Sequence, residues 1–226
     1  QSRCILFTNG KVKNLILITS LFCLIQCPCF SENKHEMDSL KIALTQAKED
    51  TTQLKLYIAL GLACDIENNL KYAEPSLKLA DKLLKSNISK AQKEKVIDYK
   101  IGALNLIDVY HKSLNKESYN PFNVINQILK FTNELHDTNR TITYLLRKSD
   151  QHKVSLDLPK ALETVESALN LAKLSKNKKG LSASLTKLGS LFESQNNYTQ
   201  ALEKYQESLK IRYQFDNPAR VEIIFF

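Results

Sequence analysis

One residue spacing recurs along this chain and restricts its fold more than any other feature. Its clearest copy lies in residues 185–211, where Leu185, Gly189 and Phe192 stand at i, i+4 and i+7. These intervals mark one face of a helix. After a polar break at Gln195-Asn196-Asn197, three residues repeat the intervals on a second helix: Ala201, Tyr205 and Ser208. The copy therefore predicts a helix, a short turn and a second helix.

Two small residues have a mechanical role in this hairpin. Gly189 and Ala201 are predicted to lie where the two helices cross, because interaxial distances of about 8–10 Å leave no room for a large side chain. A single copy would describe any helical hairpin, so the architecture depends on whether the spacing recurs.

Two further copies of the spacing lie earlier in the chain. In every copy 12 residues separate the small residue of the first helix from the Ala of the second, and the last two copies are 40 residues apart. The 88 residues between the first two copies leave room for one more unit. A fixed period in this range indicates stacked supersecondary units. The repeated positions are Tyr57, Gly61, Cys64, Leu70, Ala73, Leu77 and Ala80 in the first copy, and Leu145, Ser149, His152, Leu158, Ala161, Val165 and Ala168 in the next.

The pattern resembles the tetratricopeptide repeat, which has small and aromatic residues at these positions. The best match comes from one copy: Gly189, Phe192, Tyr198, Ala201 and Tyr205. A spacing of 40 residues exceeds the family's usual 34 and implies longer helices. Trp is absent, and Tyr213 stands where the closing Pro belongs. The resemblance covers residues 40–226 and implies an all-α fold, with helical hairpins stacked as a right-handed α-solenoid of about four repeats.

Residues 1–30 are predicted to be a signal peptide or an N-terminal membrane anchor. Lys11 and Lys13 precede the apolar run Leu15–Ile25, which is too short for a spanning helix and typical of a signal-peptide core. Lipidation at Cys27 and a buried N-terminal helix are the alternatives. The prediction places the protein outside the cytosol, as a periplasmic or membrane-associated protein.

Cysteine usage agrees with export. Four of the five cysteines lie in residues 1–30, so cleavage would leave only Cys64 and no internal disulfide. We expect Cys64 to be a small buried core residue.

The remaining chain divides into residues 31–50, a leader and first helix capped by Asp38 or Ser39, and residues 51–226, the repeats. Pro75 lies inside a predicted helix and is expected to kink it or to mark a late start.

Further boundaries follow from local signals. Ser89 with Gln92 forms a capping-box pattern that opens one helix, and Asn120-Pro121 starts the next. Together these two helices are predicted to form a degenerate second repeat. Lys176–Gly180 is the most obvious loop of the chain. A further helix ends at the apolar Ile223–Phe226, where a solenoid needs a polar cap. This ending predicts that the chain is truncated at its C-terminus.

The sequence contains no recognisable catalytic motif. Phosphate-loop, nucleophile-elbow and zinc-protease patterns are absent, and the four histidines have no metal-ligand spacing. We therefore expect no catalytic residue, no metal and no cofactor. Of the net charge of +8, three charges (Arg3, Lys11 and Lys13) lie near the N-terminus. The remaining charge of about +5 accompanies interspersed Lys and Glu, which indicates a solvated helical surface and argues against a nucleic-acid partner.

Resemblance to the repeat family implies a protein or peptide partner on the concave face, which the first helix of each pair lines. In the last copy the predicted binding residues are Thr186, Ser190, Glu193 and Ser194. Lys and Asn groups that some members use to clamp a terminal carboxylate are absent there. The groove could hold a helix or an extended peptide.

The layout of leader and repeats also resembles the N-terminal sensing regions of bacterial membrane signalling proteins. In those proteins the repeats precede a spanning helix and a histidine kinase, a nucleotide cyclase or a DNA-binding domain. This resemblance implies membrane attachment through the N-terminal segment or through a helix beyond residue 226.

Overall fold

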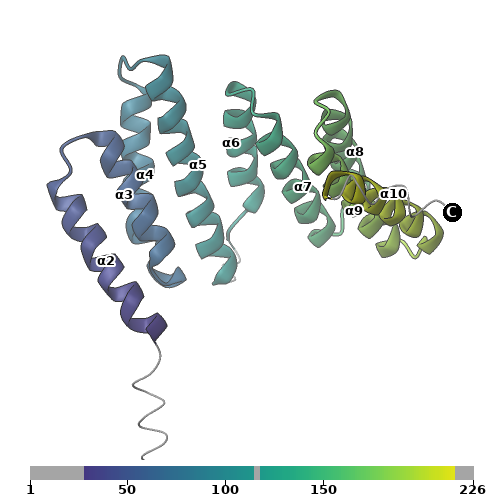
Figure 1. The fold of residues 1–226 in the computed structure, drawn as a ribbon, viewed down its shortest axis with the longest axis horizontal. Helices are drawn as coiled ribbons and strands as arrows, with labels where there is room; N and C mark the ends of the chain where they lie inside the picture. Colours follow the sequence, from purple (N-terminus) through teal and green to yellow (C-terminus); the bar gives the residue numbers. More distant parts are fainter. Residues whose placement is uncertain (1–27, 115–117, 217–226) are drawn as a thin grey trace, which may run out of the picture.

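The computed structural model describes residues 28–114 and 118–216 as helices joined by short turns, with no strand in these ranges. The helices follow one another in a curved row (Figure 1). The predicted all-α solenoid is confirmed. The elements are α2 Pro28–Gln46, α3 Asp50–Ala63, the 3-10 helix η1 Ile66–Asn68, α4 Asn69–Leu84, α5 Lys90–Ser113, α6 Pro121–Glu134, α7 Thr138–Val154, α8 Leu158–Leu174, α9 Lys178–Ser194 and α10 Tyr198–Asp216.

Helices α3/α4, α7/α8 and α9/α10 form hairpins; the α7/α8 hairpin stacks on α9/α10, and α3/α4 packs against α5. The first helices of successive pairs lie side by side, α3 against α5 and α7 against α9. We call this side of the array the A-helix face. Within the part of the chain that the structure describes, no helix has the length and apolarity needed to cross a membrane.

One turn geometry joins the last five helices at a 20-residue interval. The helix ends in a residue with positive φ, and the next residue is Asp or Asn. The backbone N–H of that Asp or Asn donates to a carbonyl five residues earlier, which is the Schellman closure. Its side chain accepts from the N–H three residues later, which caps the next helix. The pairs are His136-Asp137, Leu156-Asp157, Lys176-Asn177 and Asn196-Asn197.

The predicted close crossing at Gly189 is confirmed. A Cβ on Gly189 would lie 2.8 Å from the Tyr205 ring and 3.1 Å from the Ala201 carbonyl oxygen. One repeat earlier the hydroxyl of Ser149 donates to the Ala161 carbonyl oxygen at 2.9 Å. A small residue is thus needed at both crossings, and the hydroxyl of Ser149 fits because it bonds to the facing backbone.

Gly61 performs a different task from the one predicted. A Cβ there would lie 2.4 Å from Cδ1 of Leu106 on α5, so its size permits contact between α3 and α5. Cys64, expected in the core, is half-buried at the C-cap of α3, and its thiol donates to the Gly61 carbonyl oxygen at 3.4 Å. Burial raises the pKa of this thiol.

Most other repeat positions pack as expected. Full or nearly full burial is found for Gly61, Ala73, Ala80, Ala161, Val165, Ala168, Gly189 and Ala201. Half-buried positions are Tyr57, Leu77, Phe192 and Tyr205. Tyr198 is the exception, because its side chain is 63% exposed.

Several predicted boundaries need correction. Helix α2 begins at Pro28, so Asp38 and Ser39 lie within it and neither caps it; Asp38 instead pairs with Lys41 one turn later. Pro75 is accommodated inside α4. Lys178–Gly180 form the first turn of α9 and are not a loop. The capping box at Ser89 is confirmed, as is the Asn120 cap of α6.

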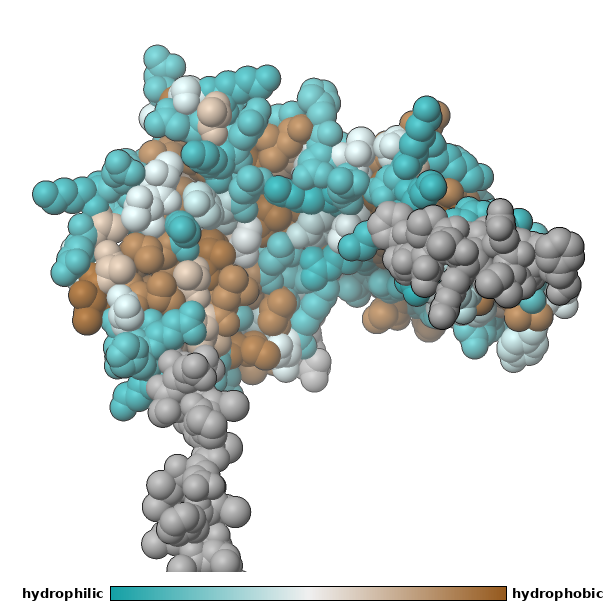
Figure 2. Space-filling view, viewed as in Figure 1, coloured by the Kyte–Doolittle hydropathy of each residue, from teal (hydrophilic) through white to brown (hydrophobic). Residues whose placement is uncertain are grey.

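On the face drawn in Figure 2, exposed apolar side chains are unevenly distributed. Figure 2 shows them concentrated over α2 to α5, whereas the surface over α6 and α7 is mainly hydrophilic. On α10 an apolar stripe faces solvent among the described residues, and its first three members are equivalent to α8 residues that pack against α9, Leu158, Leu162 and Leu169. The stripe consists of Tyr198, Leu202, Leu209 and Tyr213. Residues 1–27 of the predicted signal peptide or anchor, which spans residues 1–30, and the predicted final helix in 219–226 lie outside the described residues.

Candidate functional site

Thr186, the first residue of the predicted binding set, belongs to the contact between α9 and α10. Its hydroxyl donates to the Ser182 carbonyl oxygen at 3.0 Å and lies 2.8 Å from Ser208 Oγ. The expectation that Thr186 is exposed was wrong, because its side chain is half-buried. The equivalent residue one repeat earlier, Leu146, likewise packs into the core between α8 and α9.

The other three predicted residues also have partners within the protein. The Lys153 ammonium donates to the backbone oxygen and hydroxyl of Ser190, at 3.2 and 3.0 Å. Glu193 accepts from the Tyr205 hydroxyl at 2.9 Å, and Ser194 donates to the Ser190 carbonyl oxygen. Burial and the bond to Glu193 raise the pKa of Tyr205. Ligand binding by these residues stays a prediction, and the geometry shows that they stabilise the repeat.

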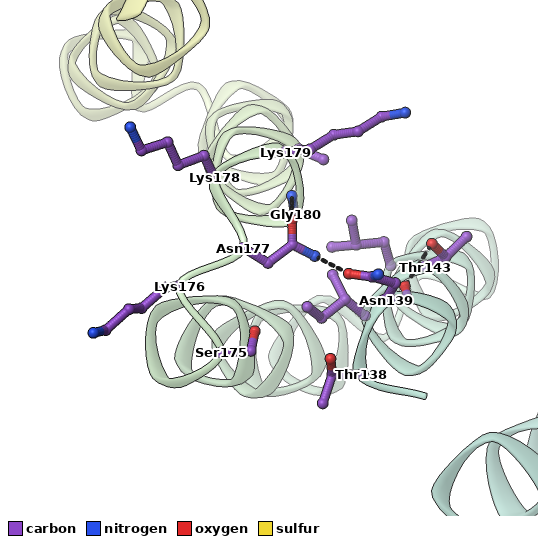
Figure 3. Close-up of a pocket in the computed structure, with 12 residues that line it drawn as sticks. Thr138, Asn139, Thr143, Ser175, Lys176, Asn177, Lys178, Lys179 and Gly180 are labelled. Atoms are coloured by element: carbon purple, nitrogen blue, oxygen red, sulfur yellow. Dashed lines mark hydrogen bonds between the residues drawn. The ribbon is translucent and has the colours of Figure 1, made fainter. Parts of the chain in front are cut away.

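A pocket of about 770 Å³ opens instead between the N-terminal ends of α7 and α9 (Figure 3). We call it the lysine-rimmed pocket. Its lining comes from both helices and from the turn that precedes α9. The lining residues are Thr138, Asn139, Ile142, Thr143, Leu146, Ser175, Lys176, Asn177, Lys178, Lys179, Gly180 and Ala183.

The base of the pocket is tied together by Asn177. Its amide nitrogen donates to Asn139 Oδ1 at 2.7 Å, and its amide oxygen accepts from the Gly180 N–H at 2.8 Å. A Cβ on Gly180 would lie 2.8 Å from the Asn177 amide nitrogen and 3.1 Å from Cδ1 of Ile142. Glycine therefore lets the amide bridge α7 and α9 over a packed floor, and the pocket is formed before any ligand binds.

Three lysines surround the pocket. Figure 3 shows the side chains of Lys176, Lys178 and Lys179 extending away from the Asn177–Asn139 bridge in different directions. All three are exposed, and none forms an ion pair with an acid in residues 28–114 or 118–216. Further along α9, by contrast, a lysine does form an ion pair: Lys187 pairs with Asp150 of α7. The pocket mouth is therefore locally positive.

The chemistry of this pocket is suited to binding. Its lining contains hydroxyls, amides, ammonium groups and apolar side chains, and no His, Cys, Asp or Glu. Across the described residues no group of three or more His, Cys, Asp or Glu side chains could hold a metal ion.

Polar contacts also join the neighbouring helices of the A-helix face. Arg140 of α7 pairs with Asp98 of α5, and Asn105 bonds to the Tyr144 hydroxyl and to Arg147 at 2.9 Å each. These links connect α5 and α7 across the A-helix face.

A buried carboxylate closes the connection after α5. Asp108 accepts from the Tyr119 hydroxyl at 2.7 Å and from the Lys112 ammonium at 2.8 Å. His111 stacks on the Tyr119 ring at 4.6 Å between centroids. Burial first and the bond to Asp108 second raise the pKa of Tyr119. The cluster fastens the segment before α6 to α5.

The lysine-rimmed pocket was missed because its residues were assigned to a loop. Three lysines within four residues, with no acid between Leu171 and Leu191, were the available signal. The second half of the pocket comes from α7, and no spacing within α9 identifies that neighbour.

Comparisons with known proteins agree with this architecture. Residues 152–214 match the family model described as "Tetratricopeptide repeat", which supports a repeat of that type and, with it, a module for protein–protein interaction. No curated protein matches the chain. The crystal structure of BtubC (BKLC) from P. vanneervenii is similar with a TM-score of 0.65 and 14% identity, over 82% of this chain and 75% of that one. At that identity the likeness shows the fold alone.

Proposed function

We propose that this chain is a non-catalytic interaction module that holds a peptide segment of a partner protein against the A-helix face. The observation that carries the proposal is the preformed pocket between α7 and α9, which has an apolar floor and a polar rim. Pockets of this kind orient a ligand with few convergent polar groups. The match to a repeat family that generally mediates protein–protein contact supports the same conclusion.

Selection from a displayed library of random peptides tests this function. Selected peptides should bind the unaltered chain and lose affinity for a Thr143→Arg variant, because Thr143 is exposed and lines the pocket. Ser167→Arg is the matched control, since Ser167 is exposed on the neighbouring helix α8 and does not line the pocket. If no peptide is selected, or if both variants bind equally well, the proposal is wrong.

A second proposal concerns the larger protein. We propose that the chain is exported and serves as the input region of a membrane signalling enzyme, a sensor histidine kinase or nucleotide cyclase, or of a DNA-binding regulator. The basic and apolar leader supports export, and the uncovered apolar stripe on α10 is suited to a further packed helix.

Two observations test this second proposal. Expression in a bacterial host should deliver the chain to the periplasm, with the mass of residues 1–30 removed if the leader is cleaved; retention in the cytosol at unchanged mass would contradict export. The reading frame after Phe226 should encode a spanning helix followed by an effector domain. A stop codon directly after Phe226 would exclude the signalling context.

A further inference from the structure

We propose that the lysine-rimmed pocket binds an acidic peptide segment in which one aliphatic side chain is flanked by Asp or Glu residues. This inference rests on the proposed peptide-binding function and specifies the chemistry of its partner. It follows from three properties of the pocket: uncompensated charge at the mouth, an apolar floor and a rigid base.

The charge at the mouth favours carboxylates. Lys176, Lys178 and Lys179 contribute three cationic groups to one opening, and the twelve lining residues include no acid. Clustered like charges raise the local concentration of oppositely charged ligands. Because these ammonium groups are solvated and unpaired in the described chain, a peptide carboxylate can approach them without breaking an existing ion pair.

The floor favours an aliphatic side chain. Leu146 and Ala183 lie half-buried between the two helices below the rim, beside the fully buried Ile142. An apolar side chain placed there would lose water contact, which contributes free energy in proportion to the area buried. A ligand consisting only of charge would leave this floor uncovered.

Hydroxyl groups occupy the space between floor and rim. Thr138, Thr143 and Ser175 line the sides of the pocket (Figure 3). The Thr143 and Ser175 hydroxyls donate to the backbone carbonyl oxygens of Asn139 and Leu171, so toward an extended peptide they act as acceptors for its N–H groups. The Asn177 amide is already bonded on both its atoms. The site therefore offers a peptide three kinds of contact on a base that does not need to rearrange.

Nucleic acid fits the pocket less well. Single strands are held by a basic groove combined with aromatic side chains on which bases stack. None of the twelve lining residues is aromatic. Beyond the rim, Lys187 is neutralised by Asp150, so the positive surface is confined to the pocket mouth.

Fluorescence anisotropy with the full chain tests the inference. The probe is a fluorescein-labelled, end-capped peptide with a central Leu between Asp and Glu residues. The affinity of this peptide for a Lys178→Glu/Lys179→Glu variant should be lower by about tenfold or more. Its affinity for the unaltered chain should fall as the salt concentration is raised. Lys82→Glu/Lys85→Glu on α4 makes the same charge change at exposed positions outside the pocket, and should retain binding. Circular dichroism confirms that each variant is folded.

Two companion peptides separate the contribution of the apolar side chain from that of the acidic residues. Replacing Leu by Ser in the peptide, or exchanging its acids for Lys, should each weaken binding about tenfold. The inference is overturned if the Ser peptide binds equally well, if charge reversal at Lys178 and Lys179 has no effect, or if a single-stranded oligonucleotide binds as tightly as the peptide. Library peptides that are blocked by Thr143→Arg but are not acidic would overturn this inference alone and leave the proposed function intact.

Discussion

Substituting two facing residues, Gly189 and Tyr205, tests whether the close helix crossing depends on matched side chains. A methyl group added at Gly189 would lie 2.8 and 2.9 Å from two ring carbons of Tyr205, and 3.1 Å from the Ala201 carbonyl oxygen. In the preceding repeat the equivalent residues are Ser149 and Val165. A Cβ is therefore accepted at this crossing when the facing residue is smaller than Tyr.

The expected magnitude follows from two opposing terms. Gly189→Ala should stabilise α9 by about 1 kcal/mol through helix propensity, while overpacking against the ring should cost about 1–3 kcal/mol. The net loss is about 0–2 kcal/mol. With Tyr205→Val already present, the ring clash is absent, while the propensity gain and the 3.1 Å approach to the Ala201 carbonyl oxygen are the same in both backgrounds and cancel from the coupling. The coupling between the two substitutions should therefore be about 1–3 kcal/mol.

Urea denaturation followed by circular dichroism measures this coupling across a double-mutant cycle. The control cycle combines Gly189→Ala with Leu209→Ala. Leu209 lies on α10, as Tyr205 does, but it is 52% exposed, and none of its atoms is among those that a Cβ at Gly189 would meet. The control pair should be additive. A coupling below about 0.5 kcal/mol for Gly189 with Tyr205 would show that the ring does not limit this crossing.

Three further outcomes are expected. Ala201→Leu should lower the free energy of unfolding by about 1–3 kcal/mol in the same assay, since Ala201 is 3% exposed at the crossing. Ser89→Ala should cost about 1 kcal/mol by removing the capping box, and an unchanged denaturation midpoint would contradict this role. Tyr119→Phe should cost about 1–3 kcal/mol at neutral pH because Asp108 loses a hydrogen bond. The pKa of Tyr119 is raised on folding, so its stabilisation is complete below the unfolded value of about 10 and is lost as pH rises above it; titration of unfolding should show this loss in the wild type and not in the Phe variant.

Features fixed within one hairpin could be predicted from the sequence. The crossing at Gly189 and Ala201 is encoded by residues 12 positions apart, and the Ser89 capping box by residues three apart. Such features depend on local steric and hydrogen-bonding requirements, which a spacing records directly. The repeat architecture followed because the same local solution occurs several times.

Features created between repeats were harder to predict. Gly61 is small because Leu106 of α5 packs on it, and the two residues are 45 positions apart. Thr186 points into the contact with α10, although its own helix pattern suggested an outward position. The lysine-rimmed pocket likewise needs α7 and α9 together. In each case the partner lies on another helix, and a single sequence without that neighbour does not identify it.

The common turn geometry gives a reason to assign the lysines to function. Four successive turns close with the same backbone bonds and the same Asp or Asn cap, so the fold determines the cap but not the two residues after it. Those two residues differ from turn to turn: Thr138-Asn139, Leu158-Pro159, Lys178-Lys179 and Tyr198-Thr199. Neither propensity nor capping requires two cations at the start of α9, where the helix dipole disfavours positive charge. A charge that the fold tolerates at some cost, placed beside a preformed pocket, is best explained by an anionic partner.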